Sequence, residues 1–173
     1  MAGKGSWTAL LLVMVTACTP AGPQSKSAPP RVTEDGGIPK NESISLDDDR
    51  HAAIANLDPA LLTAMRKAAV DAKAAGVELR VTSGWRSAEY QQRLLDEAVE
   101  LYRSEEEARR WVLPPEKSAH VTGKAIDIGP TNADDWLIQH GADYGLCQAY
   151  ANEMWHFELL TTPGGQCPQP QST

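Results

Sequence analysis

The sequence lacks the features of a membrane-spanning or nucleic-acid-binding protein. The apolar run between Gly5 and Val15 is shorter than the roughly 20 apolar residues that a spanning helix needs. No stripe of lysines and arginines is present that would neutralise nucleic-acid phosphates, and the formal net charge of the 173 residues is −7. We therefore expect no nucleic-acid partner and no spanning helix.

The N-terminus has the build of a secretory signal peptide: Lys4, then the apolar run, then small residues. Residues 15–18, Val-Thr-Ala-Cys, resemble a bacterial lipobox, which implies cleavage before Cys18 and lipid attachment to its sulfur. The alternative is an ordinary signal peptide with an incidental cysteine. With the lipobox, residues 1–17 are a lipoprotein signal peptide. We then expect a protein of the bacterial cell envelope, lipid-anchored on the outer face of the cytoplasmic membrane.

The rest of the chain divides by composition into three parts. Residues 18–45 are rich in Pro, Ser, Gly and Lys, and we expect them to form a flexible tether. Residues 46–167 have a length that suits one compact domain with a single core. Residues 168–173 are expected to form a disordered tail. We expect one domain, and a monomer.

Cysteine is scarce, with three residues in the chain. If Cys18 carries the lipid, Cys147 and Cys167 remain as a pair in a compartment where disulfides persist. We expect them to be bonded, although two buried free thiols are the alternative. The bond would close a loop that contains His156.

The spacing of apolar residues predicts an α+β domain with helices packed on one side of a small antiparallel sheet. The expected elements are a helix between an N-cap at Asp58 and Gly76, a strand over 77–82, a helix capped by Ser87, a short helix capped by Ser104, a strand over 125–129, a helix ending at Gly141 and a strand over 155–159.

Only four histidines occur, and two of them, His120 and His156, stand in polar segments that apolar residues flank. A catalytic zinc ion needs three protein ligands and an open fourth position for water. His120, Asp127 and His156 supply such a set for one Zn²⁺ ion, although other divalent ions would also bind these ligand types. The remaining histidines, His51 and His140, are expected to be structural.

The strand patterns predict where the acidic side chains point. On the strand over 125–129, Ile126 and Ile128 share one face, so Asp127 points to the other. Glu153 precedes His156 by three positions, which on one continuous strand would place the two on opposite faces. We therefore expect Glu153 in the turn before the strand, within reach of a metal-bound water.

Three motifs in chain order carry a resemblance to a known family. They are Ser83-Gly84-Trp85-Arg86, then Ser-x-His-x-x-Gly-x-x-x-Asp over 118–127, then Glu-x-x-His over 153–156. Together they resemble the zinc D-alanyl-D-alanine carboxypeptidases of the VanY type and the related D-Ala-D-Ala dipeptidases. The resemblance implies a fold like that of the hedgehog domain and the D-Ala-D-Ala peptidases, which hosts several functions.

The resemblance also implies roles for individual residues. The two histidines and the aspartate named above would bind zinc, Glu153 would be the general base, and Arg86 would stabilise developing negative charge. Ser118 would bind substrate or stabilise its loop. Trp85 and Trp155 are expected to be packing residues, with a place on the wall of the site as the alternative.

The activity that the resemblance implies is hydrolysis of the terminal D-Ala-D-Ala bond of peptidoglycan stem peptides. Another cell-wall endopeptidase or dipeptidase reaction remains an alternative, as does a catalytically inactive zinc module that binds cell-wall peptide.

Overall fold

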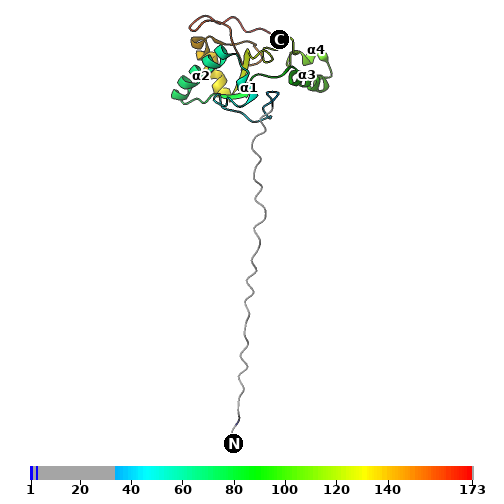
Figure 1. Cartoon of the computed structure of the whole chain (residues 1–173), viewed down its shortest axis with the longest axis vertical. Helices are drawn as coiled ribbons and strands as arrows, with labels where there is room; N and C mark the ends of the chain where they lie inside the picture. The colour runs from blue at the N-terminus through cyan, green and yellow to red at the C-terminus, as the bar shows by residue number, and fades with distance from the viewer. Residues whose placement is uncertain (2, 4–33, 173) are drawn as a thin grey trace. The chain divides into compact units, whose positions relative to one another are not determined.

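The computed structural model of the chain describes residues 1, 3 and 34–172. Apart from Met1 and Gly3, the predicted signal peptide and the lipobox with Cys18 lie outside the described residues. The elements of the folded unit, shown in Figure 1, are α1 (Ala52–Ala55), α2 (Pro59–Ala74), β1 (Arg80–Ser83), α3 (Ala88–Tyr102), α4 (Glu105–Ala108), β2 (Ala125–Gly129), α5 (Thr131–His140), the 3₁₀-helix η1 (Gly141–Tyr144), β3 (Leu146–Gln148) and β4 (His156–Leu159). Within the described part of the chain no helix is both long and apolar enough to cross a bilayer.

The four strands form one antiparallel sheet in the order β1-β2-β4-β3. In the register of β2 and β4, Ile126 lies opposite Phe157 and Asp127 lies opposite His156. Since directly opposed residues share a face, one face carries the apolar pair and the other carries the polar pair. The predicted small antiparallel sheet is confirmed.

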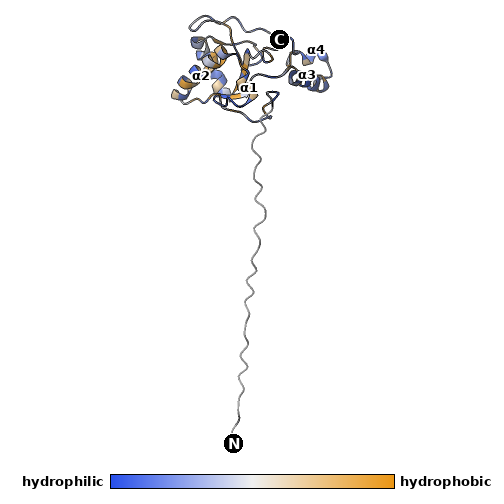
Figure 2. Ribbon diagram, in the orientation of Figure 1, coloured by the Kyte–Doolittle hydropathy of each residue, from blue (hydrophilic) through white to orange (hydrophobic). Residues whose placement is uncertain are grey.

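The apolar face of the sheet is covered by α2 and α5. α2 begins where predicted, because the Asp58 carboxylate accepts hydrogen bonds from the backbone N–H groups of Ala60 and Leu61. The helices and the sheet share one buried core, which includes Leu61, Met65, Ala68, Ile126, Ile128, Leu137, Leu146 and Phe157. Figure 2 shows the apolar segments of the folded unit in orange. The helices that contact the sheet therefore pack on one side of it, as predicted, and leave the polar face for the site.

A second, smaller cluster joins α3 and α4, which lie side by side in Figure 1. The hydroxyl groups of Ser87 and Ser104 cap these two helices by accepting from the backbone N–H groups of Tyr90 and Glu107. Both caps confirm the prediction.

The predicted strand over 77–82 is wrong in its first residues. Gly76 adopts a left-handed conformation with φ of +80°, and the Val77 N–H then returns to the carbonyl of Ala72. These bonds extend the C-terminal turn of α2, so β1 begins at Arg80. The short elements α1, η1 and β3 were not predicted, because each spans too few residues to show a period.

The folded unit begins earlier than the predicted boundary at Leu46. Ile44 exchanges two backbone hydrogen bonds with Val81, at 2.9 and 3.0 Å, and the N–H of Ser87 donates to the carbonyl of Asp35 at 2.9 Å. Residues 34–45 are therefore attached to the domain, where a flexible tether was expected.

Two further contacts fix the C-terminal part of the chain. Gln171 exchanges backbone hydrogen bonds with Ala149 and Ala151, so the predicted tail pairs with the domain in this region. Cys147 and Cys167 are joined by a disulfide with their Cα atoms 5.6 Å apart. The predicted pairing is confirmed, and the closed loop contains Glu153 and His156.

Candidate metal centre

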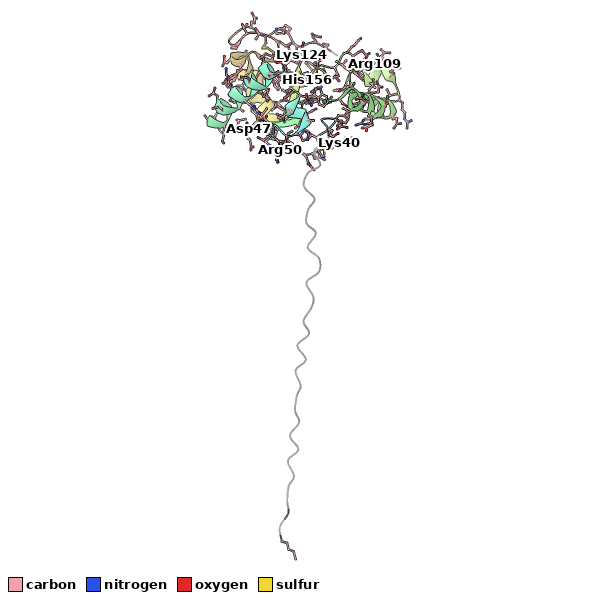
Figure 3. The ribbon with its side chains drawn as sticks, viewed as in Figure 1. Lys40, Asp47, Arg50, Arg109, Lys124 and His156 are labelled. Carbon is pink, nitrogen blue, oxygen red and sulfur yellow. A yellow bond between two sulfur atoms is a disulfide. The ribbon has the colours of Figure 1, made fainter. Side chains whose placement is uncertain are left out.

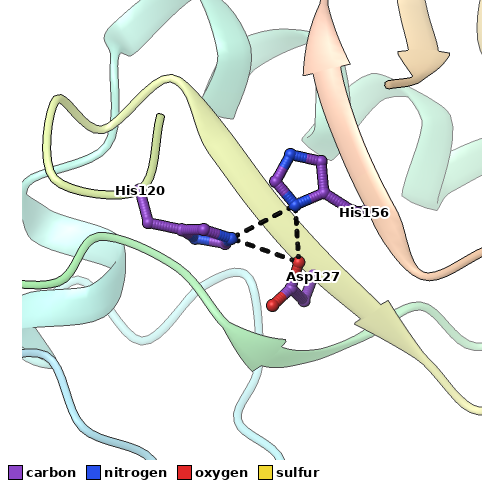
Figure 4. Close-up of side chains that lie close together, drawn as sticks. All are labelled: His120, Asp127 and His156. Atoms are coloured by element: carbon purple, nitrogen blue, oxygen red, sulfur yellow. Dashed lines mark hydrogen bonds and ion pairs between the residues drawn. The ribbon is translucent and has the colours of Figure 1, made fainter. Parts of the chain in front are cut away.

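Three segments bring His120, Asp127 and His156 together on the polar face of the sheet. Asp127 is the middle residue of β2, and His156 is the first residue of β4, directly opposite it in the register. His120 lies in the loop that leads into β2. All three side chains are buried, and Figure 4 shows them turned toward one another. The structure thus assembles the predicted ligand set.

The spacing of the ligand atoms suits a single metal ion. His120 Nε2 lies 3.3 Å from both His156 Nδ1 and Asp127 Oδ1, and His156 Nδ1 lies 3.2 Å from Asp127 Oδ1. Zinc bonds of about 2.0–2.1 Å at tetrahedral angles place neighbouring ligand atoms about 3.3–3.4 Å apart. The triangle therefore has the dimensions of three corners of a zinc tetrahedron.

The outer nitrogen of each histidine ring is already engaged. His120 Nδ1 lies 2.8 Å from the carbonyl oxygen of Gly84, and His156 Nε2 lies 3.0 Å from Glu158 Oε1. Each of these acceptors requires the neighbouring ring nitrogen to carry the proton. The lone pairs of His120 Nε2 and His156 Nδ1 then face the centre of the triangle, as metal binding requires.

The Asp127 carboxylate supplies the third lone pair. Its Oδ2 accepts a hydrogen bond from Arg86 Nη2 at 3.0 Å, whereas its buried Oδ1 has no hydrogen-bond partner among the described residues. A buried acceptor without a partner costs about 1–3 kcal/mol. A cation between the three ligand atoms would remove this cost, so the residues present fit a zinc ion.

The surroundings of the three ligands shift their pKa values and so set their protonation states. Burial alone would raise the pKa of Asp127, but His120, His156 and Arg86 outweigh it and hold the pKa well below its usual range. Burial lowers the pKa of His120. Burial also acts to lower the pKa of His156, but the carboxylates of Asp127, Glu158 and Glu153 beside the ring outweigh it and raise that pKa to about 9. Metal binding near neutral pH must therefore displace a proton from His156.

Glu153 lies beside the cluster in the turn that leads into β4. The N–H of His156 donates to the carbonyl of Glu153 at 3.3 Å, which closes this turn and confirms the predicted position. Glu153 Oε2 lies 3.6 Å from His156 Nδ1. Burial raises the pKa of the Glu153 carboxyl, so its carboxylate is a stronger base than an exposed glutamate.

Arg86 follows β1 and contacts the cluster at Asp127, whereas Glu153 contacts it at His156. Its Nε donates to Ser83 Oγ at 2.8 Å, its Nη1 to Gln91 Oε1 at 3.1 Å, and its Nη2 to Asp127. These bonds fix the plane of the guanidinium and leave further N–H groups to face the cavity. Arg86 is thus placed to position the ligand Asp127 as well as to bind negative charge.

A cavity of about 190 Å³ opens onto the cluster, and Glu153, Arg86 and Ser118 lie on its wall. The predicted site residues therefore come together around one space. The other two histidines lie elsewhere, as predicted: His51 caps α1 through Nδ1, and His140 contacts the ring of Trp136.

Residues 54–161 match the VanY family of D-alanyl-D-alanine carboxypeptidases. The chain belongs to this family. A curated member, the D-alanyl-D-alanine carboxypeptidase of Enterococcus faecalis (strain ATCC 700802 / V583), is 32% identical over 117 residues, with 51% of this chain and 42% of that protein covered. The chain thus matches less than half of the length of this relative.

Solved structures of the VanY type share the fold. A mutant of the vancomycin resistance D,D-pentapeptidase VanY from the VanB-type cassette, in complex with Zn(II), is 25% identical with a TM-score of 0.57, covering 75% of this chain and 83% of that one. VanYB in complex with D-alanine-D-alanine has the same identity and TM-score, covering 73% and 83%. The L,D-carboxypeptidase LdcB is 26% identical with a TM-score of 0.55, covering 61% and 59%. The metal in the first structure agrees with the donor set of this chain.

The sequence prediction misplaced one residue of this VanY-family site and missed two others. Trp155 was expected in the core, but it is 40% exposed and lies on the cavity wall, whereas Trp85 packs against the core as expected. Gln91 was missed, because a glutamine on a helix is usually exposed to solvent. In the structure its Oε1 accepts a hydrogen bond from Arg86 and its Nε2 donates one to the Leu113 carbonyl. Glu158 was also missed.

Proposed function

We propose that this protein is a zinc-dependent D,D-carboxypeptidase that hydrolyses the terminal D-Ala-D-Ala bond of peptidoglycan stem peptides. The observation that carries the proposal is the convergence of three metal-binding lone pairs, one of them on a buried oxygen without a partner, beside the carboxylate of Glu153. Membership of the VanY family supports the choice of reaction.

His120, Asp127 and His156 would hold the zinc ion, which lowers the pKa of its bound water and polarises the scissile carbonyl. Glu153 accepts the proton of the attacking water and delivers it to the leaving amine, a role that its raised pKa favours.

Arg86 and Ser118 act on the substrate. The guanidinium of Arg86 is fixed by three hydrogen bonds, so its remaining N–H groups are ready to donate to the oxyanion without reorganisation. Ser118 has little solvent exposure but lies on the cavity wall, and its hydroxyl has no partner among the described residues. It is free to hydrogen-bond a peptide.

The direct test is incubation of the purified protein with zinc and a stem pentapeptide that ends in D-Ala-D-Ala. We expect release of free D-alanine. Hydrolysis of free D-Ala-D-Ala but not of the pentapeptide would identify a dipeptidase, cleavage of cross-links an endopeptidase, and cleavage of a tetrapeptide at its L,D bond an L,D-carboxypeptidase. No release from any of these substrates would refute the proposal.

An inactive zinc module that binds cell-wall peptide is the candidate of another class. Glu153 lies 3.6 Å from His156 Nδ1 and Arg86 pairs with Asp127 at 3.0 Å, which supports hydrolysis because a binding module has no use for a base there. Substitution of Glu153 separates the two candidates, because only an enzyme loses its function with its zinc retained.

We also propose that the protein acts as a monomer tethered to the outer face of the cytoplasmic membrane through a lipid on Cys18. The lipobox and the Cys147–Cys167 disulfide support an exported location. A Cys18→Ser variant should leave the membrane fraction and lose incorporation of labelled fatty acid; retention of both would refute the anchor.

A further inference from the structure

A second cavity, of about 550 Å³, lies beside the metal cavity. The two cavities share Arg86, Asp127 and Trp155 as lining residues, so they meet at the metal cluster. The metal cavity is the smaller of the two, at about 190 Å³. The active-site cleft therefore continues past the cluster into a larger space.

One wall of this second cavity comes from residues 34–45, which contribute Ile38 and Lys40, and the facing wall comes from Tyr90 and Leu94 of α3. In Figure 3, Lys40 lies near the lower edge of the folded unit, toward α3. Away from the metal cluster, the cavity thus combines the apolar side chains of Ile38 and Leu94 with polar ones and with one lysine.

The N-terminal wall is held firmly in place. Ile44 pairs with Val81, and the Asp35 carbonyl accepts from the Ser87 N–H. Gly36 has a φ of +84°, and a Cβ added there would lie 2.0 Å from the carbonyl oxygen of Trp85. This close approach requires glycine. The segment is a fixed part of the cleft.

Lys40 is positioned to receive a negative charge. Its side chain is exposed, and it makes no ion pair with any residue that the structure describes. Arg86, the other cation that lines this cavity, is already paired with Asp127, so the charge of Lys40 is available to a ligand. Lys40 also precedes residues 54–161, the part that matches the VanY family.

We propose that the second cavity binds the acyl part of the substrate peptide, and that Lys40 pairs there with a carboxylate of that peptide. This inference rests on the proposed function. A carboxypeptidase substrate is asymmetric, because a single residue leaves on one side of the scissile bond and a longer peptide remains on the other. The smaller cavity suits the leaving residue, and the larger one suits the peptide.

The test uses pairs of synthetic peptides that end in D-Ala-D-Ala. The two members of a pair differ only by glutamate or glutamine at one position before the scissile bond, and each pair places this residue at a different position. For the glutamate peptide that the wild type prefers most over its glutamine partner, Lys40→Gln should lower kcat/KM by about two- to fivefold. This is the size typical of an exposed ion pair, and it should come from a rise in KM. The same variant should leave the glutamine peptide unchanged. Lys40→Glu should give a larger loss, and 0.5 M NaCl should reduce both effects.

Lys67→Gln is the matched control, because Lys67 is an exposed lysine on α2, which covers the opposite face of the sheet. It should not change the ratio between the two peptides. An equal effect of Lys40→Gln on both peptides at every position, or no effect, would overturn the inference while wild-type turnover still supports the proposed function. Absence of turnover by the wild-type protein would overturn both.

Discussion

Glu158 is predicted to tune the affinity of the protein for its metal, although it does not touch the ion site. Its Oε1 accepts the Nε2 proton of His156 at 3.0 Å, and the side chains of Glu158 and His156 are 16% and 5% exposed. This bond holds one ring proton on Nε2, so that Nδ1 can direct its lone pair at the centre of the ligand triangle, and it increases the basicity of the ring.

Glu158→Ala removes the acceptor and should weaken zinc binding by about 10- to 100-fold, which corresponds to about 1.4–2.7 kcal/mol. Glu158→Gln keeps an acceptor oxygen but loses the charge, so it should fall between the wild type and Glu158→Ala. The measurement is competition for zinc against a chromophoric chelator. Glu100→Gln, on an exposed position of α3, is the control. Equal zinc affinity in the wild type and Glu158→Ala would refute the reasoning.

Three further predictions follow from the same geometry. Arg86→Ala should lower kcat by about 10²–10³-fold with a smaller effect on zinc content, because it removes an oxyanion donor; a larger loss of zinc than of turnover would contradict this role. The double substitution Cys147→Ser and Cys167→Ser should reduce the free energy of unfolding by about 3 kcal/mol in urea titrations, since the disulfide closes a loop of 20 residues. Asp134 is buried, and one of its oxygens has no hydrogen-bond partner within the part of the chain that the structure describes; burial, then Asp135 and Asp127, raise its pKa to about 6 from 3.8. This carboxylate destabilises the fold increasingly as the pH rises from about 4 to 6, so Asp134→Asn should add about 1–3 kcal/mol above pH 6 and nothing below pH 4. Equal thermal midpoints at pH 7.5 would contradict that expectation.

The ligand set was predictable because three motifs in chain order carry the family resemblance, and the local strand patterns agree with it. The alternation of Ile126 and Ile128 fixes the direction of Asp127, and the odd spacing of Glu153 and His156 excludes one continuous strand for both. The same period of two places Glu158 on the face of His156. Its role depends on which ring nitrogen faces the metal, and only the positions of the other ligands decide that.

The cleft beyond the ligands was not predictable, because its walls meet only through tertiary contacts. Residues 34–45 are poor in large apolar side chains, which favours a tether, yet Ile38 and Ile44 suffice to dock them when β1 offers a free edge. Aromatic residues are usually buried, but the turn before β4 leaves the side chain of Trp155 exposed. Such outcomes depend on which surfaces meet, and a linear pattern does not contain that information.

Parallel assay of the wild-type protein and Glu153→Gln for zinc content and for D-alanine release tests the central claim most directly. The claim predicts one zinc ion per chain in both proteins, because His120, Asp127 and His156 are unchanged, and D-alanine release by the wild type alone. A wild-type protein that binds no zinc, or a Glu153→Gln variant that releases D-alanine at the wild-type rate, would contradict it.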